Sequence, residues 1–387
     1  MTSTTPVRVL IVGAGAVGTW LAYRFARAGH QVTVVGRPRY VQAVQERGLG
    51  LIEAGEGETA SFVREVQAVA DLATLQGQSF DLVALTMKAY DVDAAVEELS
   101  RLGIRFRWPL VLIQNGVGVE EMVSEKLWRG AALCLCATRA MTQVEPALVR
   151  MDSPRGGVVL APTAPGQPVE EVAALFREAG FQNVRTHDDH RSVRWSKLLL
   201  NLVGGAQSAI LDCTPPQMYR DRRLVALTLE SMQEAIAVMR RLGVRPIPLP
   251  SYPAHLFVFL AEVLPAWLAQ PIILRLVARG RGAKVPAIQQ DLMRGKKRLE
   301  VEVMNGAVSS YGKQAGVPTP VNDVLYRTLS GIARGDIPWD EFRGKPERLL
   351  AAVEARRKEL AAAPRGGGPF RALWRWLAYQ MGISKTW

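Results

Sequence analysis

The chain has 387 residues, with 48 lysines and arginines against 36 aspartates and glutamates, which gives a formal net charge of +12. Hydrophobic residues make up 48% and charged residues 22%, proportions of a globular protein that exclude a largely disordered chain. The length exceeds what one hydrophobic core usually supports, so it predicts two domains. Three cysteines are too few for a disulfide framework, and we therefore expect a reducing, cytoplasmic compartment.

The excess of positive over negative charge lies entirely in the second half of the chain. Residues 1–186 have a net charge of −1, whereas residues 187–387 have a net charge of +13. Such asymmetry raises nucleic acid, a membrane surface or an anionic ligand as candidate partners. No helix-turn-helix, zinc-finger or RNA-recognition pattern accompanies the charge, so we do not expect nucleic-acid binding.

The first 35 residues predict a strand, a glycine-rich turn, a helix and a second strand. Val9–Val12 is a short apolar run, a segment of helical periodicity ends at Gly29, and Gln31–Val35 is a second apolar run. The turn between the first strand and the helix consists of Gly13, Ala14, Gly15, Ala16, Val17 and Gly18. In such a turn the first glycine permits the tight bend, the second admits a pyrophosphate to the backbone, and the third lets helix and strand pack closely. The pattern predicts a Rossmann fold with a dinucleotide at the helix N-terminus.

The end of the second strand distinguishes between the two nicotinamide cofactors. NAD sites commonly have an aspartate or glutamate there to hold the ribose 2′-hydroxyl, but this chain has Gly36 and Arg37, with Arg39 close behind. A guanidinium can hold a 2′-phosphate with two hydrogen bonds. We therefore expect NADP(H), with Arg37 at the 2′-phosphate, while Arg39 could equally be a solvated loop charge.

Polar side chains follow two later strands. The apolar run 80–87 leads into Lys88, and the run 109–114 leads into Asn115. In an open parallel sheet, ligands bind beyond the carboxyl ends of the strands. Lys88 and Asn115 are therefore expected near the nicotinamide end of the site.

No metal site is predicted. Cys134 and Cys136 alternate along a strand, which places both thiols on one face, and they lack the spacing and partners of a zinc site. His187 and His190 have no third ligand nearby in the sequence, and this arrangement is more typical of a solvated turn.

From about residue 187 the sequence changes to long helical patterns. Residues 191–205 are apolar on most faces, yet Lys197 and Asn201 lie four positions apart and so on one side of the helix. A lysine there either extends to solvent or is desolvated and functional. Further on, Glu300 and Glu302 cannot share a helix face, so one could face the site while the other is solvated.

Taken together, these motifs resemble those of the 2-dehydropantoate 2-reductase (ketopantoate reductase) family. The segments that carry the resemblance are, in order, GAGAVG, the Gly36–Arg37 strand end, TMKAY, QNGVG, RWSKLLLN and EVEVMNG, across residues 7–330. The resemblance implies an α/β N-terminal Rossmann domain and a mainly α-helical C-terminal domain of the 6-phosphogluconate-dehydrogenase type. It also implies that NADPH reduces a 2-oxo acid like ketopantoate to the 2-hydroxy acid. In this family that reaction is a step of pantothenate biosynthesis.

The resemblance further implies roles for individual residues. Lys197 would be the general acid that protonates the ketone oxygen as the hydride arrives, and Glu300 the carboxylate near that lysine. Asn201 would contact the substrate. Lys88 and Asn115 would contact both the cofactor and the substrate.

The chain departs from the family pattern at the substrate end of the site. Gly205 occupies a position where the family commonly has a second asparagine, and Pro286 and Ala287 occupy positions where it commonly has serines. Losing hydrogen-bond donors changes which substrate a polar pocket accepts. A less polar ketone or 2-oxo acid is therefore an alternative substrate. A non-catalytic NADP(H)-binding regulator is the alternative from another class, although a pure binder would not need the lysine, asparagine and glutamate.

The expected division of the chain is a dinucleotide-binding domain over residues 1–186, a helical catalytic domain over 187–335 and a C-terminal extension over 336–387. The second domain contains an insertion around 246–286 that is rich in proline and apolar residues. Because two prolines interrupt its apolar stretch, we expect two short buried helices at a subunit contact or pocket wall rather than a membrane span.

The C-terminal extension contains a predicted linker, residues 361–369, and an amphipathic segment, residues 370–381. Aromatic and aliphatic side chains of that segment fall on one helical face, with arginines on others. Such a helix could lie weakly on an anionic membrane surface, or dock on its own or a partner subunit. Docking of this helix on a partner subunit would form a homodimer.

Overall fold

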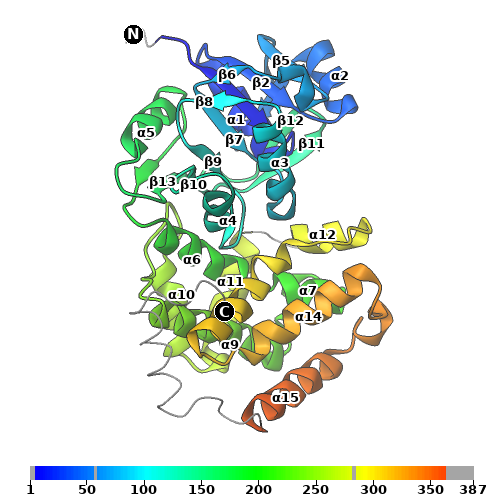
Figure 1. Cartoon of the computed structure of the whole chain (residues 1–387). Helices are drawn as coiled ribbons and strands as arrows, with labels where there is room; N and C mark the ends of the chain where they lie inside the picture. The colour runs from blue at the N-terminus through cyan, green and yellow to red at the C-terminus, as the bar shows by residue number, and fades with distance from the viewer. Residues whose placement is uncertain (1–4, 56–58, 281–284, 363–387) are drawn as a thin grey trace, which may run out of the picture.

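The computed structural model describes residues 5–55, 59–280 and 285–362. An N-terminal α/β domain with a mainly parallel sheet lies above a C-terminal domain of helices (Figure 1). This is the fold class that the sequence predicts.

The main sheet has eight strands in the order β14-β13-β10-β9-β7-β1-β2-β5. Their bounds are Arg8–Val12 (β1), Gln31–Val35 (β2), Val66–Val69 (β5), Leu82–Leu85 (β7), Leu110–Leu112 (β9), Ala132–Ala137 (β10), Val158–Pro162 (β13) and Val184–Thr186 (β14). All neighbours in this sheet pair in parallel except β10 and β13. Smaller pieces are a four-stranded sheet of β11 (Met141–Glu145), β12 (Leu148–Met151), β3 (Leu49–Ile52) and β4 (Ala60–Val63), and a pair of β6 (Ser79–Phe80) and β8 (Arg105–Phe106).

Helices cover both faces of the main sheet, which explains why its strands are apolar runs rather than alternating patterns. The helices of this domain are α1 (Ala16–Arg27), α2 (Pro38–Arg47), η1 (Leu72–Leu75), α3 (Ala89–Arg101), α4 (Val119–Lys126) and α5 (Val169–Glu178). In β1, Val9 and Ile11 pack into the core under α1 and α5, whereas Leu10 and Val12 pack into the core under α3 and α4. The predicted unit of strand, glycine turn, helix and strand is therefore present as β1, α1 and β2.

The C-terminal domain is built around α9 (Arg222–Arg241). The other helices are α6 (His190–Asn201), α7 (Gly205–Leu211), α8 (Pro215–Met218), α10 (Ala254–Glu262), α11 (Ala266–Gly280), α12 (Ala287–Met293), η2 (Glu300–Glu302), α13 (Asn305–Ala315), α14 (Pro320–Arg334), η3 (Trp339–Glu341) and α15 (Pro346–Ala362). The buried Glu234 of α9 accepts hydrogen bonds from the backbone N–H groups of Val321 and Asn322, at 2.8 and 2.9 Å. These contacts satisfy the otherwise unpaired donors at the start of α14.

The predicted insertion forms two helices, α10 and α11, but the expectation that they are buried is wrong in part. Both pack on α9, yet Phe259, Val263, Trp267 and Leu268 remain exposed. Pro265 lies in the short segment that separates the two helices. Pro271, in contrast, lies inside α11, and the helix continues past it. No helix within the described residues is long and apolar enough to cross a membrane.

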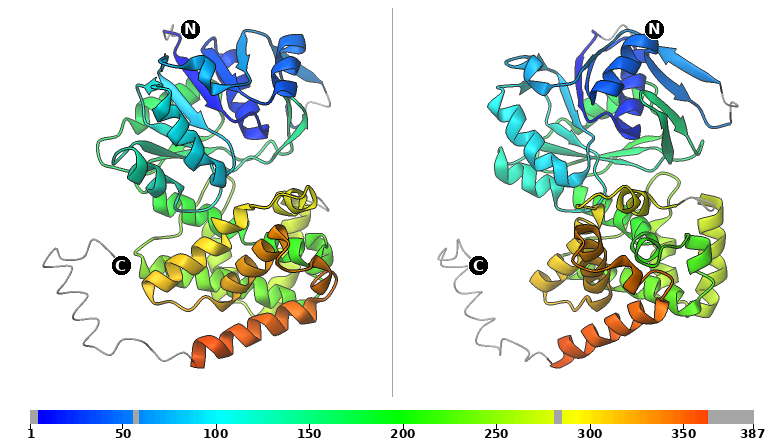
Figure 2. Two further views of the ribbon diagram at one scale, coloured as in Figure 1. Left: turned by 45° about the vertical axis from the view of Figure 1, so that its right-hand side comes forward. Right: turned by 90° about the vertical axis from the view of Figure 1, so that its right-hand side faces the viewer.

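The C-terminal extension adds α15 on the side of the helical domain remote from the sheet (Figure 2). It packs on α14, where Arg356 pairs with Asp323 at 2.6 Å, and Arg357 pairs with Glu230 of α9. The described part of this helix reaches Ala362. Most of the predicted linker, and the whole amphipathic segment 370–381, lie outside the described residues.

Candidate active site

The glycine turn shows directly why two of its glycines are needed. Gly13 has a φ of +112°, and a Cβ there would lie 2.7 Å from the backbone nitrogen of Met87. A Cβ on Gly18 would lie 1.9 Å from the carbonyl oxygen of Gly13. A Cβ on Gly15, by contrast, would meet nothing within 4 Å. The fold therefore requires the first and third glycines, while the second leaves open space beside the backbone.

That open space adjoins the start of α1, where Gly15 is the N-cap and makes no capping hydrogen bond with a side chain. Ala16 and Val17 form the first helical residues, so their N–H groups belong to the unpaired donors that bind anions at helix N-termini. Ala14 lies between the two glycines, against the end of β2. These residues fit the pyrophosphate of a dinucleotide.

Two side chains outside the turn hold its backbone. The hydroxyl of Thr86, just after β7, donates to the carbonyl oxygen of Gly13 at 2.5 Å. The amide of Gln143 on β11 donates to the carbonyl oxygen of Ala14 at 3.2 Å. Sequence reasoning missed Gln143, because no local pattern links it to a turn 129 residues away.

Arg37 lies where the sequence places it, at the end of β2, as the exposed N-cap of α2. A Cβ on Gly36 would lie 2.6 Å from the Cβ of Ala14, so this strand end packs closely against the glycine turn. Arg39 is also exposed, and residues 36–40 include no carboxylate. The guanidinium groups can therefore meet an anion beside the turn without a competing acid from this segment.

Four of the predicted site residues come together where the two domains meet. Lys88, the N-cap of α3, donates to Glu300 at 2.5 Å. The amide of Asn115 donates to the other oxygen of Glu300, and the amide of Asn201 donates to the oxygen of Asn115, both at 3.4 Å. Lys88 and Asn115 come from the α/β domain, whereas Asn201 and Glu300 come from the helical domain.

A fifth residue, Asp291 of α12, joins this cluster and was assigned no role from the sequence. Its carboxylate lies 3.2 Å from the Lys88 ammonium. Burial alone would lower the pKa of Lys88, but the carboxylates of Glu300 and Asp291 outweigh burial and raise that pKa, so the ammonium stays charged. Glu302 takes no part, because it pairs with Arg298 at 3.0 Å, as expected for a residue that cannot share the face of Glu300.

Lys197 lies on α6 one turn before Asn201 and is half-buried. Burial raises the pKa of the Cys136 thiol, and the Lys197 charge opposes this rise, which places the ammonium near β10. Cys134 and Cys136 are both buried and pack in one core, as the alternation of the strand predicts. Lys197 thus lies at the same junction as the cluster around Lys88.

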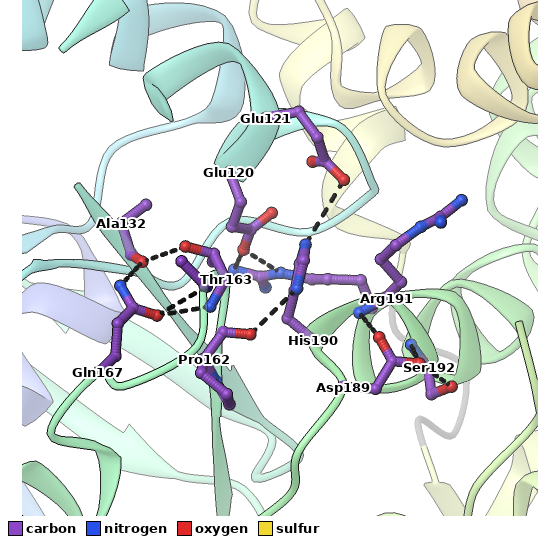
Figure 3. A network of polar contacts seen from close by, with 12 residues as sticks. Glu120, Glu121, Ala132, Pro162, Thr163, Gln167, Asp189, His190, Arg191 and Ser192 are labelled. Atoms are coloured by element: carbon purple, nitrogen blue, oxygen red, sulfur yellow. Dashed lines mark hydrogen bonds and ion pairs between the residues drawn. The ribbon is translucent and has the colours of Figure 1, made fainter. Parts of the chain in front are cut away.

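The expectation of a solvated turn at the two histidines is wrong for His190. Only 14% of its side chain is exposed; its Nδ1 lies 3.1 Å from the carbonyl oxygen of Pro162, and its Nε2 lies 3.5 Å from a Glu121 oxygen (Figure 3). The ring is enclosed because the start of α6 meets α4 and the end of β13. Across the ranges that the structure describes, no three His, Cys, Asp or Glu residues are grouped to hold a metal ion.

The positions that depart from the family pattern form an apolar wall between α7 and α12. A Cβ on Gly205 would lie 3.7 Å from the side chain of Ile288, and Ala287 next to it is exposed. The nearby amide groups of α12 are engaged elsewhere: Gln289 donates to Asp212 at 3.1 Å, and Gln290 donates to a backbone carbonyl at 2.9 Å. Among the described residues, this wall therefore offers no free side-chain donor.

Comparisons with known proteins identify the family and the fold of this chain. Two family models match, "Ketopantoate reductase PanE/ApbA" over residues 9–165 and its C-terminal counterpart over residues 189–333. A 2-dehydropantoate 2-reductase of Pyrococcus horikoshii is 26% identical over 322 residues, covering 83% of this chain and 95% of the relative.

Solved structures show the same likeness. A PanE/ApbA family ketopantoate reductase from Ralstonia eutropha is 29% identical, with a TM-score of 0.69 over 84% of this chain and 98% of that one. A D-mandelate dehydrogenase in complex with NADH and anilino(oxo)acetate shares the fold at 19% identity, with a TM-score of 0.67 and the same two shares of coverage.

Proposed function

Because the chain belongs to the ketopantoate reductase family, we propose that it is an NADPH-dependent reductase that converts a 2-oxo acid into the 2-hydroxy acid. The observation that carries this proposal is the convergence of Lys88, Asn115, Asn201 and Glu300 at the junction that also contains Lys197. The family, and a protein of the same fold in complex with NADH, support a nicotinamide dinucleotide as the cofactor. Arg37 and the absence of a carboxylate at residues 36–40 support the phosphorylated form.

The chemistry assigns one role to each group. The nicotinamide supplies a hydride to the carbonyl carbon when it is bound. Lys197 hydrogen-bonds the carbonyl oxygen, stabilises the negative charge that develops there and donates the proton that completes the hydroxyl group. The carbonyl C=O π bond breaks as the C–H and O–H bonds form, so the product is the 2-hydroxy acid.

The neighbouring residues orient the reacting groups. Glu300 accepts hydrogen bonds from both Lys88 and Asn115, so one carboxylate fixes two donors from the other domain. Asn201 and Asn115 place their amides side by side. Fixed donors of this kind need no reorganisation during the reaction, which lowers the barrier.

An apolar 2-oxo acid is a second candidate substrate, and the wall of Gly205, Ala287 and Ile288 favours it. A substrate hydroxyl directed at this wall would find no side-chain donor among the described residues. An apolar pocket discriminates only modestly against an added hydroxyl, by about 100-fold or less. Ketopantoate would then be accepted, but less well than its analogue without the hydroxyl.

A matched set of substrates tests the proposal. NADPH oxidation is measured with ketopantoate, with trimethylpyruvate (the same acid with hydrogen in place of the hydroxyl) and with pinacolone, the ketone in which a methyl group replaces the carboxylate of trimethylpyruvate. Reduction of either acid by the wild type, together with poor reduction of the ketone, supports a 2-oxo acid reductase. NADPH binding without reduction of any of the three would favour the regulator instead.

Lys197→Ala tests the general acid. We expect turnover to fall by about 100-fold to 10,000-fold, the usual contribution of a positioned acid, with NADPH affinity retained. Lys313→Ala, which removes an exposed lysine of α13, is the matched control and should keep full activity. Undiminished turnover in Lys197→Ala would remove the lysine from the mechanism.

A further inference from the structure

A polar stripe runs along the face of α6 that meets the α/β domain. His190, Arg194, Lys197 and Asn201 are spaced at i, i+4, i+7 and i+11, which places them on one side of the helix. The residues at both ends of the stripe contact the α/β domain, His190 through Pro162 and Asn201 through Asn115. Lys197 lies between these contacts.

Arg194 makes the strongest contact of the stripe. Its Nε donates to Glu120 of α4 at 2.6 Å, while its two terminal nitrogens donate to the backbone carbonyls of Gln114 at 2.6 Å and Leu112 at 2.7 Å. The side chains of Arg194 and Glu120 are only 5% and 1% exposed. The planar guanidinium is the side chain that can satisfy acceptors in three directions at once.

The carbonyls that Arg194 binds lie at the carboxyl end of β9 and just after it. Gln114 directly precedes Asn115, the residue that contacts Glu300 and Asn201. On α6, Arg194 lies one turn before Lys197. One guanidinium therefore connects the strand end that carries Asn115 with the helix turn that carries Lys197.

We infer that Arg194 is a positioning residue that fixes the register of α6 against the end of β9, so that Lys197 faces the substrate carbonyl beside Asn115. This inference rests on the proposed role of Lys197. Any slip of α6 along the domain junction would separate a buried cation from a buried carboxylate and remove a donor from two backbone carbonyls, and buried charges left unpaired in this way are strongly disfavoured. The contact therefore holds the helix in one position, and catalysis by a fixed acid requires that.

Arg194→Lys is the primary test. Lysine keeps the charge but concentrates its donors at one point, so it cannot serve Glu120 and both carbonyls in the geometry of the fork. We expect a folded protein with an NADPH dissociation constant close to that of the wild type and a kcat lower by about 100-fold, the effect of a displacement near 1 Å. KM for the 2-oxo acid should change far less than kcat. Arg191→Lys, the same exchange on the same helix, is the control and should leave kcat unaffected.

A second variant separates positioning from stability. In Arg194→Met/Glu120→Met neither charge is left unpaired, and replacing a buried ion pair by apolar side chains of similar size is often neutral for stability. The carbonyls at the end of β9 nevertheless lose their donors. We expect unfolding in urea close to that of the wild type, with the same loss of kcat as in Arg194→Lys.

A readout that does not depend on turnover completes the test. The rate at which Lys197 is acetylated by acetic anhydride, followed by mass spectrometry across a pH series, reports the surroundings of its amine. We expect the acetylation rate at a given pH to change severalfold in Arg194→Lys, or the pH at which the amine becomes reactive to move. Neither quantity should change in Arg191→Lys. Unchanged labelling in a folded Arg194→Lys protein, or an unchanged kcat, would overturn the inference. If the wild type reduces no 2-oxo acid, the proposed function fails, while the labelling still decides the role of Arg194.

Discussion

The glycine turn of the α/β domain and the α7–α12 wall of the helical domain both bring small residues to a candidate binding site, but for different physical reasons. Gly13 and Gly18 are required by the fold itself, because a Cβ on either would collide with backbone atoms at 2.7 Å or less. Gly205 has ordinary space beside it, with the nearest atom 3.7 Å from its ideal Cβ. The backbone therefore requires Gly13 and Gly18 but not Gly205, so substitutions at Gly205 can test the proposed substrate site without disturbing the fold.

The largest difference between the two regions should appear on adding a single methyl group. Gly18→Ala places a Cβ 1.9 Å from a backbone oxygen, so we expect the free energy of unfolding to fall by about 3 kcal/mol and NADPH binding to be lost. Gly205→Ala adds the same group without a clash and should change the free energy of unfolding by no more than about 0.5 kcal/mol. Urea unfolding and NADPH titration measure both quantities.

Gly15→Ala sharpens this contrast within the turn. Its Cβ would meet no protein atom within 4 Å, so stability should be retained, while NADPH affinity should fall because the methyl group enters the space assigned to the pyrophosphate. A Gly15→Ala protein that binds NADPH as tightly as the wild type would place the phosphates elsewhere.

The next effect concerns the cofactor side alone. Arg37→Ala should weaken NADPH binding by about 10-fold to 100-fold, the range for lost hydrogen bonds to a charged group, and leave NADH binding unchanged. Dissociation constants for both cofactors decide the matter. Arg39→Ala is the matched control, since Arg39 is exposed on the same segment. If Arg39→Ala removes the preference and Arg37→Ala does not, the 2′-phosphate assignment moves to Arg39.

The corresponding test on the substrate side is expected to have a smaller effect. Gly205→Asn and Ala287→Ser each add a hydrogen-bonding group to the wall, and a Cβ at Gly205 would make only an ordinary contact with Ile288, at 3.7 Å. We expect the kcat/KM ratio of ketopantoate to trimethylpyruvate to rise by about 10-fold, which corresponds to one added hydrogen bond. Gly205→Ala fills part of the same space without a polar group and should leave the ratio unchanged. An unaltered ratio in both polar variants would show that the substrate hydroxyl does not face this wall.

The sequence predicts the glycine turn more fully than it predicts the contacts at the domain junction, because only the turn depends on local patterns. The β1–α1–β2 unit and its glycines follow local rules of turn geometry and apolar periodicity, so both could be derived from some 30 consecutive residues. Lys88, Asn115, Asn201 and Glu300 were found through their motifs, and the structure brings them together. Their mutual contacts depend on how the two domains meet, and no local pattern encodes that.

The residues that were missed depend on contacts between segments distant in the chain. In the sequence, Arg194 is indistinguishable from any other charge on an apolar helix. The structure shows that Glu120 and the end of β9 surround it. The sequence predicts a solvated turn at His190, whereas in the structure Glu121 helps to enclose its ring. Burial of a charge is a property of the folded junction, so sequence reasoning could assign the helix but not the partners.

The smallest predicted effect lies at that junction and depends on pH. Burial alone would lower the pKa of His190, but the ion pair with Glu121 and the charges of Glu120 and Asp189 outweigh burial and raise that pKa above 6.5. Since the folded state then binds the proton more tightly than the unfolded state, the pair adds stability that is fully present below pH 6.5. That contribution is lost as the pH rises through the raised folded-state pKa.

Glu121→Gln should remove this contribution while leaving the neighbouring Arg194–Glu120 pair intact. We expect the free energy of unfolding of the wild type to exceed that of the variant by about 1 kcal/mol or less below pH 6.5, because the side chain of Glu121 is 41% exposed and solvent screens the pair. The difference should shrink as the pH rises, down to the part that comes from the contacts of Glu121 with its own backbone N–H and with Arg191, which also lower the pKa of Glu121. Urea unfolding of both proteins from about pH 5 to about pH 9 measures it. His30, whose pKa is lowered by burial, titrates in both proteins, so it cancels in the difference. A difference that grows with pH would show that His190 is neutral in the folded protein, and that Glu121 stabilises the start of α6 by other means.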